Sequence, residues 1–420
     1  MDQDRLSSAD VSNLLLEFPD HPNLFQLAGV LGPGGFVGTD GSLDLAGLRT
    51  RLGVRLADPQ LARLSRVVRR RGRHFTWEPV SPDLTVHIRL TDPVADETEF
   101  AALVARLMTR PLPLDRPLWE LLIVPATADG APGLILRVHH ALADGVGAAR
   151  LAQVLFGGEP PTPRPDRAPD PTRRHGAEIL ESLRRVSAPL RGRVAPTVLL
   201  GPISPHRVVA LVGADLGAVA TAVHPMGATV NDALLCAVTG AVRAALAEAG
   251  EPVPAVMPAS VPVALPERGA SGNAVGVMLV PLPTGEADVW VRLSRIAAET
   301  RRGKEAARRA GTFEFTRTRC GTRLLARLSH RQRFIGLFVT HVRGPAEPFR
   351  VAGAPMRQAW GVAQVYGNVR LGVTAISSAG RLNCALHVAS PALDASTLER
   401  ALHTEFAALT APRPTGDPTA

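Results

Sequence analysis

The chain has 420 residues, which exceeds the length at which a single hydrophobic core keeps growing, so we expect two domains of roughly 200 residues. Hydrophobic residues make up 45% and charged residues 20%, which excludes a disordered or fibrous protein. The net charge of +9 favours anionic partners, but no recognition motif or pattern of stacking aromatics accompanies it, so we expect no nucleic-acid binding.

The cysteines and the start of the chain bear on its location. Cys236, Cys320 and Cys384 lie far apart and form no Cys-x-x-Cys pair, so we expect neither a disulfide framework nor a metal site. The first ten residues are polar and acidic where a signal peptide would be basic and then apolar. No apolar run reaches the ~18 residues that a membrane-spanning helix needs. We therefore expect a cytoplasmic protein whose contact with a membrane, if any, is peripheral.

Strands and helices alternate along the chain without a strict repeat, which predicts an α/β fold with mixed sheets. Short runs rich in Val, Ile and Leu predict strands over 84–90, 119–125, 133–139, 274–282 and 382–388. Apolar residues at helical spacing predict helices over 97–109, 145–156, 232–249, 289–310 and 393–409.

A proline-rich segment divides the chain. Residues 157–171 contain six prolines, a composition that resists both helix and sheet, and 177–194 has the spacing of an amphipathic helix. We therefore expect an N-terminal domain over 1–156, a linker over 157–205, a C-terminal domain over 206–410 and a disordered tail over 411–420.

The run from His139 to Gly145 carries the candidate chemistry. Alternation along the strand before it places His140 on the face of Leu134, Leu136 and Val138, and Asp144 and Gly145 then begin a helix. An imidazole with a pKa of about 6.5 is suited to removing a hydroxyl proton near neutral pH. The structural alternatives stay open: His140 as a hydrogen-bonded core residue, His139 as its support and Asp144 as a helix N-cap.

Several motifs accompany this run in a characteristic order. His-His-Ala-Leu-Ala-Asp-Gly resembles the His-His-x-x-x-Asp-Gly signature of bacterial wax ester synthase/diacylglycerol acyltransferases, a branch of the chloramphenicol-acetyltransferase-like superfamily. The segment at 113–120, which includes Pro117 and Trp119, is similar to the family's Pro-Leu-Asp-Arg-x-x-Pro-Leu-Trp-Glu but two residues shorter. Asn231-Asp232, Gly272-Asn273, and the segments at 342–345 and 352–354 also resemble family motifs, as does the N-terminus with Leu6, Ser7, Asp10 and Glu17.

The resemblance implies two chloramphenicol-acetyltransferase-like domains that meet at a tunnel. Acyl-CoA would be the co-substrate, with no permanently bound cofactor, and an alcohol would be the acceptor. His140 would be the general base, Asp144 would hold the loop and Gly145 would leave room for the acyl-CoA. Asn231 is either an oxyanion donor or a helix N-cap. Trp119, Pro117, Asn273 and His341 would lie at substrate-binding positions, although packing is the alternative for Pro117 and Trp119.

Two departures leave the acceptor open. Pro22-Asn23-Leu24-Phe25 does not carry the family's Met-His-x-Gly, and His341 stands where the family usually has Asn. If the alignment holds, both changes would lie near the acceptor side of the tunnel. The hypotheses are therefore an enzyme that makes wax esters or triacylglycerol, a tailoring enzyme that esterifies a polyketide, sugar or other metabolite, and a catalytically silent lipid-binding relative.

Overall fold

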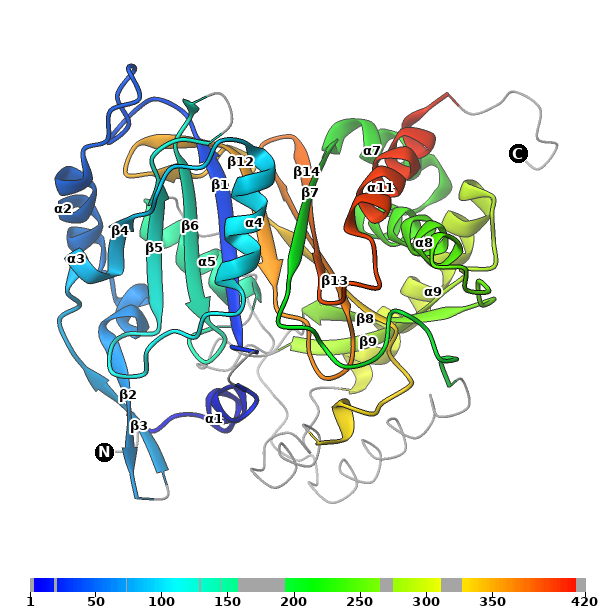
Figure 1. Ribbon diagram of the computed structural model, residues 1–420, viewed down its shortest axis with the longest axis horizontal. Helices are drawn as coiled ribbons and strands as arrows, with labels where there is room; N and C mark the ends of the chain where they lie inside the picture. The colour runs from blue at the N-terminus through cyan, green and yellow to red at the C-terminus, as the bar shows by residue number, and fades with distance from the viewer. Residues whose placement is uncertain are drawn as a thin grey trace.

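The computed structural model describes residues 4–18, 21–72, 74–127, 130–143, 145–157, 193–264, 275–310 and 327–412. Within these residues, two six-stranded sheets lie side by side and helices cover them, and a small hairpin extends from the N-terminal half (Figure 1). Both large sheets contain parallel and antiparallel neighbours. The predicted α/β class with mixed sheets is thereby confirmed.

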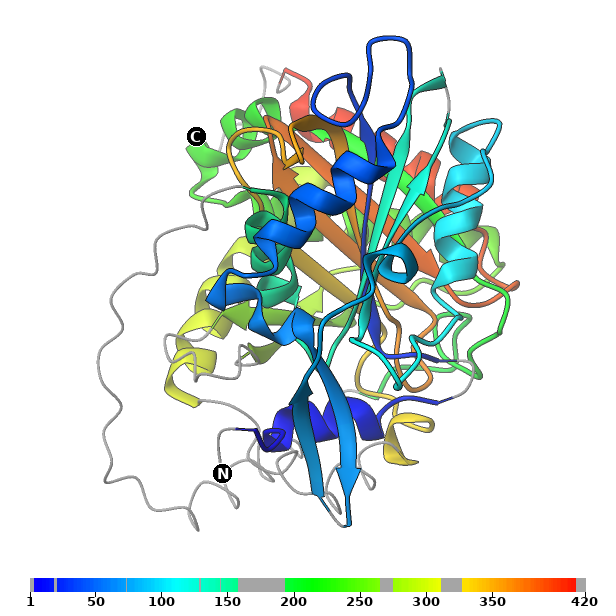
Figure 2. The same ribbon diagram turned by 90° about the vertical axis from the view of Figure 1, so that its left-hand side faces the viewer.

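The first sheet has the strand order β11-β12-β1-β6-β5-β4. Helix α4 packs on one face of it, while α2 and α5 pack on the other, and Figure 2 shows α2 and α4 on opposite sides of the strands. The bounds are β1 Leu24–Leu31, β4 Ile88–Leu90, β5 Trp119–Val124, β6 Gly133–His139, β11 Arg350–Val351, β12 Ala354–Ala363, α2 Leu45–Arg55, α4 Glu97–Leu107 and α5 Gly145–Phe156.

Shorter elements surround the lower end of this sheet. Helix α1 begins at Ser8, where the Ser7 and Asp10 side chains form a reciprocal capping box. Their bounds are α1 Ser8–Leu15, the 3-10 helix η1 Pro59–Ser65, the hairpin β2 Arg66–Arg71 and β3 His74–Pro79, and α3 Leu84–His87.

Strand β12 comes from the C-terminal half of the chain but belongs to the first sheet. It runs antiparallel to β1, from Phe25 opposite Ala363 to Leu31 opposite Met356. The domain limits of 1–156 and 206–410 stay a prediction, yet the sheets do not follow them here, because β11 and β12 complete the N-terminal sheet. Sequence reasoning missed this exchange, since the two paired strands lie more than 300 residues apart.

The second sheet has the strand order β7-β14-β13-β10-β8-β9, and helices α7, α8, α9 and α11 cover its outer face (Figure 1). The bounds are β7 Val208–Asp215, β8 Met257–Ala264, β9 Val275–Leu282, β10 Leu337–Arg343, β13 Leu371–Ser378, β14 Arg381–Val388, α7 Leu216–Val223, the 3-10 helix η4 His224–Met226, α8 Val230–Glu248, α9 Val289–Ala310 and α11 Ala395–Thr410. Its inner face is turned towards the first sheet.

Helix α8 is the central helix of this layer. It is long and apolar enough to cross a membrane by length and composition, but 72% of its apolar window is buried inside the protein. Its partners are α9, α11 and the outer face of the second sheet. The apolar character of α8 is therefore that of a core helix, in which burial on most sides replaces the usual one-sided pattern.

Most sequence-predicted elements are present, with one clear error. The strand over 133–139 and the helices over 145–156 and 289–310 have the expected bounds, and the other predicted helices agree to within about two residues. The strand predicted over 84–90 is wrong in its first half, because Asp83 caps a helical turn, α3, before β4 begins at Ile88. Residues 177–192 of the helix predicted over 177–194 lie outside the described residues, as does the tail beyond residue 412, whereas Arg193 and Val194 are described and are not helical.

Candidate active site

The two histidines follow directly from strand β6. Alternation places Leu134, Leu136 and Val138 in the core under α5, whereas Ile135 packs in the core under α4. The strand is buried on both faces, so its end carries His139 and His140 into the region where the two sheets approach each other. Helix α5 begins five residues after His140, at Gly145.

Hydrogen bonds of the backbone hold His140 in place. Its N–H donates to the carbonyl of Asn23 at 2.8 Å, and the side-chain amide of Asn13 donates to the carbonyl of His140 at 3.1 Å. The Asn23 amide in turn donates to the Asn13 carbonyl at 3.0 Å. The imidazole lies against the ring of Phe25, with the ring centroids 4.3 Å apart. Residues 22–25, which depart from the family motif, are therefore in direct contact with the candidate base.

Burial determines the protonation state of His140. It lowers the pKa of the imidazole to about 4, because the charged form loses its hydration. A hydrogen bond to the backbone of His140 itself raises the pKa, and the neighbouring His139 lowers it further. The imidazole is therefore neutral at pH 7. Its Nδ1 atom is buried.

His139 makes different contacts on the opposite face of β6. Its Nδ1 accepts a hydrogen bond from the Ala141 N–H at 2.9 Å, so in the neutral ring Nε2 carries the proton. That Nε2–H donates to a carboxylate oxygen of Glu17 at 3.1 Å. The His139 side chain is fully buried. Both ring nitrogens are thus occupied by the protein, which gives His139 a supporting position rather than an accessible one.

A buried ion pair fixes the turn that follows. Arg63 donates to the carbonyl of Leu142 at 2.9 Å and lies 3.3 Å from the carboxylate of Asp10, which is 1% exposed. Asp10 also belongs to the capping box of α1. Helix α1 therefore connects to the histidine turn through Arg63, Asn13 and Glu17. The sequence offered a signal for the cap, Ser7-x-x-Asp10, but none for these long-range contacts.

A cavity of about 60 Å³ lies next to the histidine turn, between the two sheets. Strands β1, β6 and β12 and helix α5 form one side, and strands β10 and β13 form the other. Among its described lining residues there is no charged side chain, and most are apolar. Phe25 and Gly145 line the cavity, and Phe25 also contacts His140. The tunnel expected between the two domains stays a prediction, and the described structure has this small apolar cavity between the two sheets.

The other predicted members of the motif divide into two groups. Asp144 and Asn273 lie outside the described residues, so their roles stay predictions. Gly145 is described: a Cβ atom added there would lie 3.8 Å from the Phe25 ring, an ordinary van der Waals distance. The protein alone therefore has room for a small side chain at position 145, and any need for glycine there must come from what enters the cavity.

Asn231 is not the N-cap of its helix, contrary to one of the two predicted roles. Thr229 is the N-cap, and it forms a capping box with Asp232, whose N–H donates to the Thr229 hydroxyl at 3.3 Å. The second oxygen of Asp232 accepts from the Thr300 hydroxyl of α9 at 2.6 Å. Asn231 does not line the cavity beside Phe25. The described geometry therefore gives no support to its role as an oxyanion donor.

Pro117 and Trp119 are packing residues in the described structure. The Trp119 indole N–H donates to the Leu64 carbonyl at 2.8 Å, and its ring stacks on His87 with centroids 4.6 Å apart. Trp119 is 1% exposed, Pro117 is buried, and neither lines the cavity beside His140. The alternative that we left open for this segment, packing within the N-terminal core, is the one that the contacts support.

His341 lies on the opposite face of the second sheet from the cavity. Thr340 and Val342 line the cavity, so the intervening His341 faces the helix layer, where its Nε2 is 3.1 Å from the Ser377 hydroxyl. Burial, followed by the charge of Arg343, lowers the pKa of His341 to about 4. The expectation that this residue contacts a substrate in the tunnel therefore finds no support in the cavity that the structure describes.

Nucleophilic and metal chemistry have no evident residues in the described part of the chain. The thiols of Cys236 and Cys384 are buried, and burial raises their pKa values to about 11 and 12, so both stay protonated at pH 7. No cluster of three His, Cys, Asp or Glu side chains occurs among the described residues.

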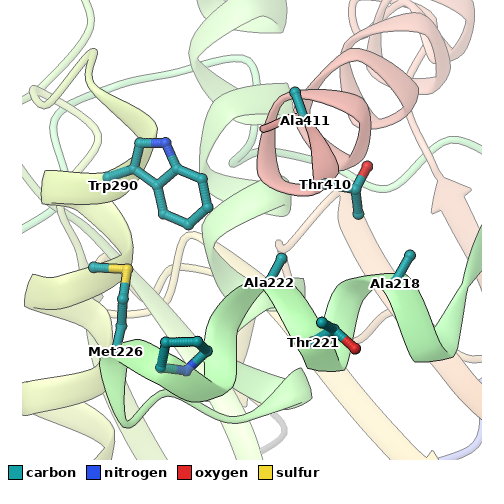
Figure 3. Close-up of a pocket in the computed structure, with 8 residues that line it drawn as sticks. Ala218, Thr221, Ala222, Met226, Trp290, Thr410 and Ala411 are labelled. Atoms are coloured by element: carbon teal, nitrogen blue, oxygen red, sulfur yellow. The ribbon is translucent and has the colours of Figure 1, made fainter. Parts of the chain in front are cut away.

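A second, larger hollow lies on the outer helix layer of the C-terminal half. Its volume is about 510 Å³, and Trp290, Met226 and Thr410 are among the side chains that surround it (Figure 3). It is formed by α7, η4 and the ends of α9 and α11, on the other side of the second sheet from His140. None of its lining residues is titratable, so it offers no acid–base chemistry.

Comparisons with known proteins agree with this architecture. A protein of Mycobacterium tuberculosis, provisionally assigned as a diacylglycerol O-acyltransferase, is 30% identical over 257 residues, which are 54% of this chain and 58% of that protein. The chain thus matches somewhat more than half the length of that relative. The wax ester synthase/diacylglycerol acyltransferase from Marinobacter aquaeolei VT8 superposes with a TM-score of 0.71 at 20% identity, covering 96% of this chain and 98% of that one.

A third similar structure is a variant of the starter condensation domain of rhizomide synthetase, in complex with C8-CoA and Leu-SNAC. It has a TM-score of 0.60 at 14% identity and covers 97% of this chain and 93% of that one. These two structural matches show a shared fold. Residues 6–192 match the wax ester synthase/diacylglycerol acyltransferase catalytic domain, and residues 271–410 match the C-terminal domain of the same family. The chain therefore belongs to the wax ester synthase/diacylglycerol acyltransferase family.

Proposed function

We propose that this protein is an acyl-CoA-dependent O-acyltransferase in which His140 is the general base. The observation that carries the proposal is a buried, neutral imidazole at the end of β6, whose ring packs against Phe25, a residue that lines the apolar cavity between the two sheets. Family membership supports acyl transfer, and the solved condensation domain with C8-CoA supports a CoA thioester as the donor. Acyl-CoA would be a substrate, and the proposal requires no permanently bound cofactor.

The reaction needs one base and no covalent enzyme intermediate. The acceptor hydroxyl oxygen attacks the thioester carbonyl carbon while His140 Nε2 takes the hydroxyl proton. The tetrahedral intermediate then collapses, the C–S bond breaks, and the CoA thiolate takes the proton from the imidazolium. The products are an ester and free CoA. A base of this kind contributes about 10²- to 10⁴-fold in rate.

The surrounding residues would position the base. The Asn23 and Asn13 contacts hold the His140 backbone, and Glu17 orients the adjacent His139. Asp144 would hold the loop. The acceptor stays open between a lipid alcohol and a specialised metabolite. The cytoplasm, with at most peripheral contact with a membrane, stays the expected location.

The test is a screen of acyl-CoA donors and alcohol acceptors with detection of free thiol. We expect His140→Ala to lower kcat by about 10²-fold or more without a large change in melting temperature. The control is His87→Ala, which removes another buried histidine with a lowered pKa, one that packs on Trp119 instead of the cavity. Its folded fraction should keep near wild-type kcat. Turnover that survives His140→Ala would exclude the mechanism.

A further inference from the structure

The cavity beside His140 is narrow compared with the ligand sites of other proteins. Its volume of about 60 Å³ is well below the ~300–1,000 Å³ of pockets that hold drug-sized ligands. A long alkyl chain does not fit without a change in the walls.

The ring of Phe25 forms the wall nearest to the candidate base. It lines the cavity on one side and contacts His140 on the other, with 4.3 Å between the ring centroids. The ring also lies close to Gly145, at the start of α5. An acyl chain that occupied this cavity would therefore contact Phe25.

The backbone that carries Phe25 is fixed on both sides. Within the first sheet, Phe25 in β1 pairs with Val138 of β6 and with Ala363 of β12. The two sheets also approach each other closely at the cavity. A Cβ atom added at Gly361 of β12 would lie 3.0 Å from the Ile376 side chain of the second sheet. These pairs hold the β1 backbone in place within the first sheet. The size of the side chain at position 25 therefore contributes to the free width of the cavity.

We propose that Phe25 limits the acyl donor to short chains. This inference rests on the proposed acyltransferase function. The lining without charged side chains is suited to the alkyl part of a thioester rather than to a hydroxyl-rich acceptor.

The first measurement compares chain lengths on the wild-type enzyme. With one accepted alcohol, kcat/KM is measured for acetyl-, butyryl-, octanoyl- and dodecanoyl-CoA by release of free thiol. We expect kcat/KM for butyryl-CoA to exceed that for dodecanoyl-CoA by at least tenfold. Equal or greater activity with dodecanoyl-CoA would overturn the inference while leaving the proposed function intact. No turnover with any acyl-CoA would instead contradict the proposed function.

The second measurement changes the ring. Phe25→Ala should raise the ratio of dodecanoyl- to butyryl-CoA activity at least tenfold, even if loss of the contact with His140 lowers both rates. Phe25→Leu, a smaller change for the fold, should give an intermediate ratio. The control Phe100→Ala removes a ring from the core on the α4 side of the same sheet. It should leave the ratio unchanged, and an unchanged ratio in both Phe25 variants would overturn the proposal.

Discussion

Two helix starts in this molecule carry family motifs, and they use their polar side chains in different ways. At the turn before α5, His139 is bound to the protein through both ring nitrogens, whereas His140 is next to a cavity. At the start of α8, the two carboxylate oxygens of Asp232 accept hydrogen bonds from Thr229 and Thr300, and the side chain is buried in the helix layer. A family motif can therefore contain a candidate reactive group in one place and a helix-capping residue in another.

The largest expected effect concerns the start of α8. Asp232→Ala removes the capping box and leaves the Thr300 hydroxyl without its acceptor, so we expect the free energy of unfolding to fall by about 2 to 4 kcal/mol. Chemical denaturation measures this loss, and kcat per folded molecule should stay close to wild type. The neighbouring Asn231→Ala is the matched control, with a change within about 0.5 kcal/mol. A large loss of kcat in Asn231→Ala, with an unchanged free energy of unfolding, would support a catalytic role for Asn231.

A smaller effect is expected from Glu17, which supports the histidine turn. Glu17→Ala leaves the buried His139 Nε2–H without its acceptor, and we expect kcat/KM to fall about tenfold as His140 shifts. Glu17→Gln keeps an acceptor oxygen and should recover most of this rate. The measurement is kcat and KM for both variants beside their melting temperatures. Equal losses in Ala and Gln would show that the charge of Glu17, rather than its position, matters.

The smallest effect on activity is expected from pH. Because burial lowers the pKa of His140 to about 4, the base stays neutral above that pH, and kcat/KM should change less than about twofold between pH 8 and pH 6. Stability behaves differently. Unfolded histidine binds a proton below about 6.5, so the stability contributed by neutral His140, His341 and His387 is lost as the pH falls from about 6.5 towards about 4.

Two pH profiles test this difference. The melting temperature should decrease below pH 6.5 while kcat/KM of the folded enzyme stays nearly flat. A kcat/KM profile that falls with an apparent pKa near 6.5 would contradict the burial of the base. Those data would then place His140 in a solvated position.

Local patterns were sufficient for much of the fold. The strand ending at His139 and the helix beginning at Gly145 were predicted correctly, because alternation and helical spacing are properties of short segments. Residues 84–90 were misassigned because the cap by Asp83 converts an apolar run into a helical turn. The Thr229-x-x-Asp232 spacing is typical of a capping box, and it indicates Thr229 rather than Asn231 as the N-cap of α8.

The candidate site was less predictable, since its contacts join distant segments. The motif identified His140, but nothing in the sequence indicates that Glu17 reaches His139 or that Phe25 covers His140. His341 was placed by similarity alone, and strand parity puts it on the other face of β10. Such errors follow from the period of two in a strand, where neighbouring residues face opposite layers.

The pairing of β12 with β1 has a consequence for the integrity of the site. A fragment ending at residue 157 would present the edge of β1 with unpaired N–H and C=O groups, which invites association with other strands. The same fragment would lack the β12 wall of the cavity beside Phe25. Segments from both halves of the chain are therefore needed to form the walls of the cavity.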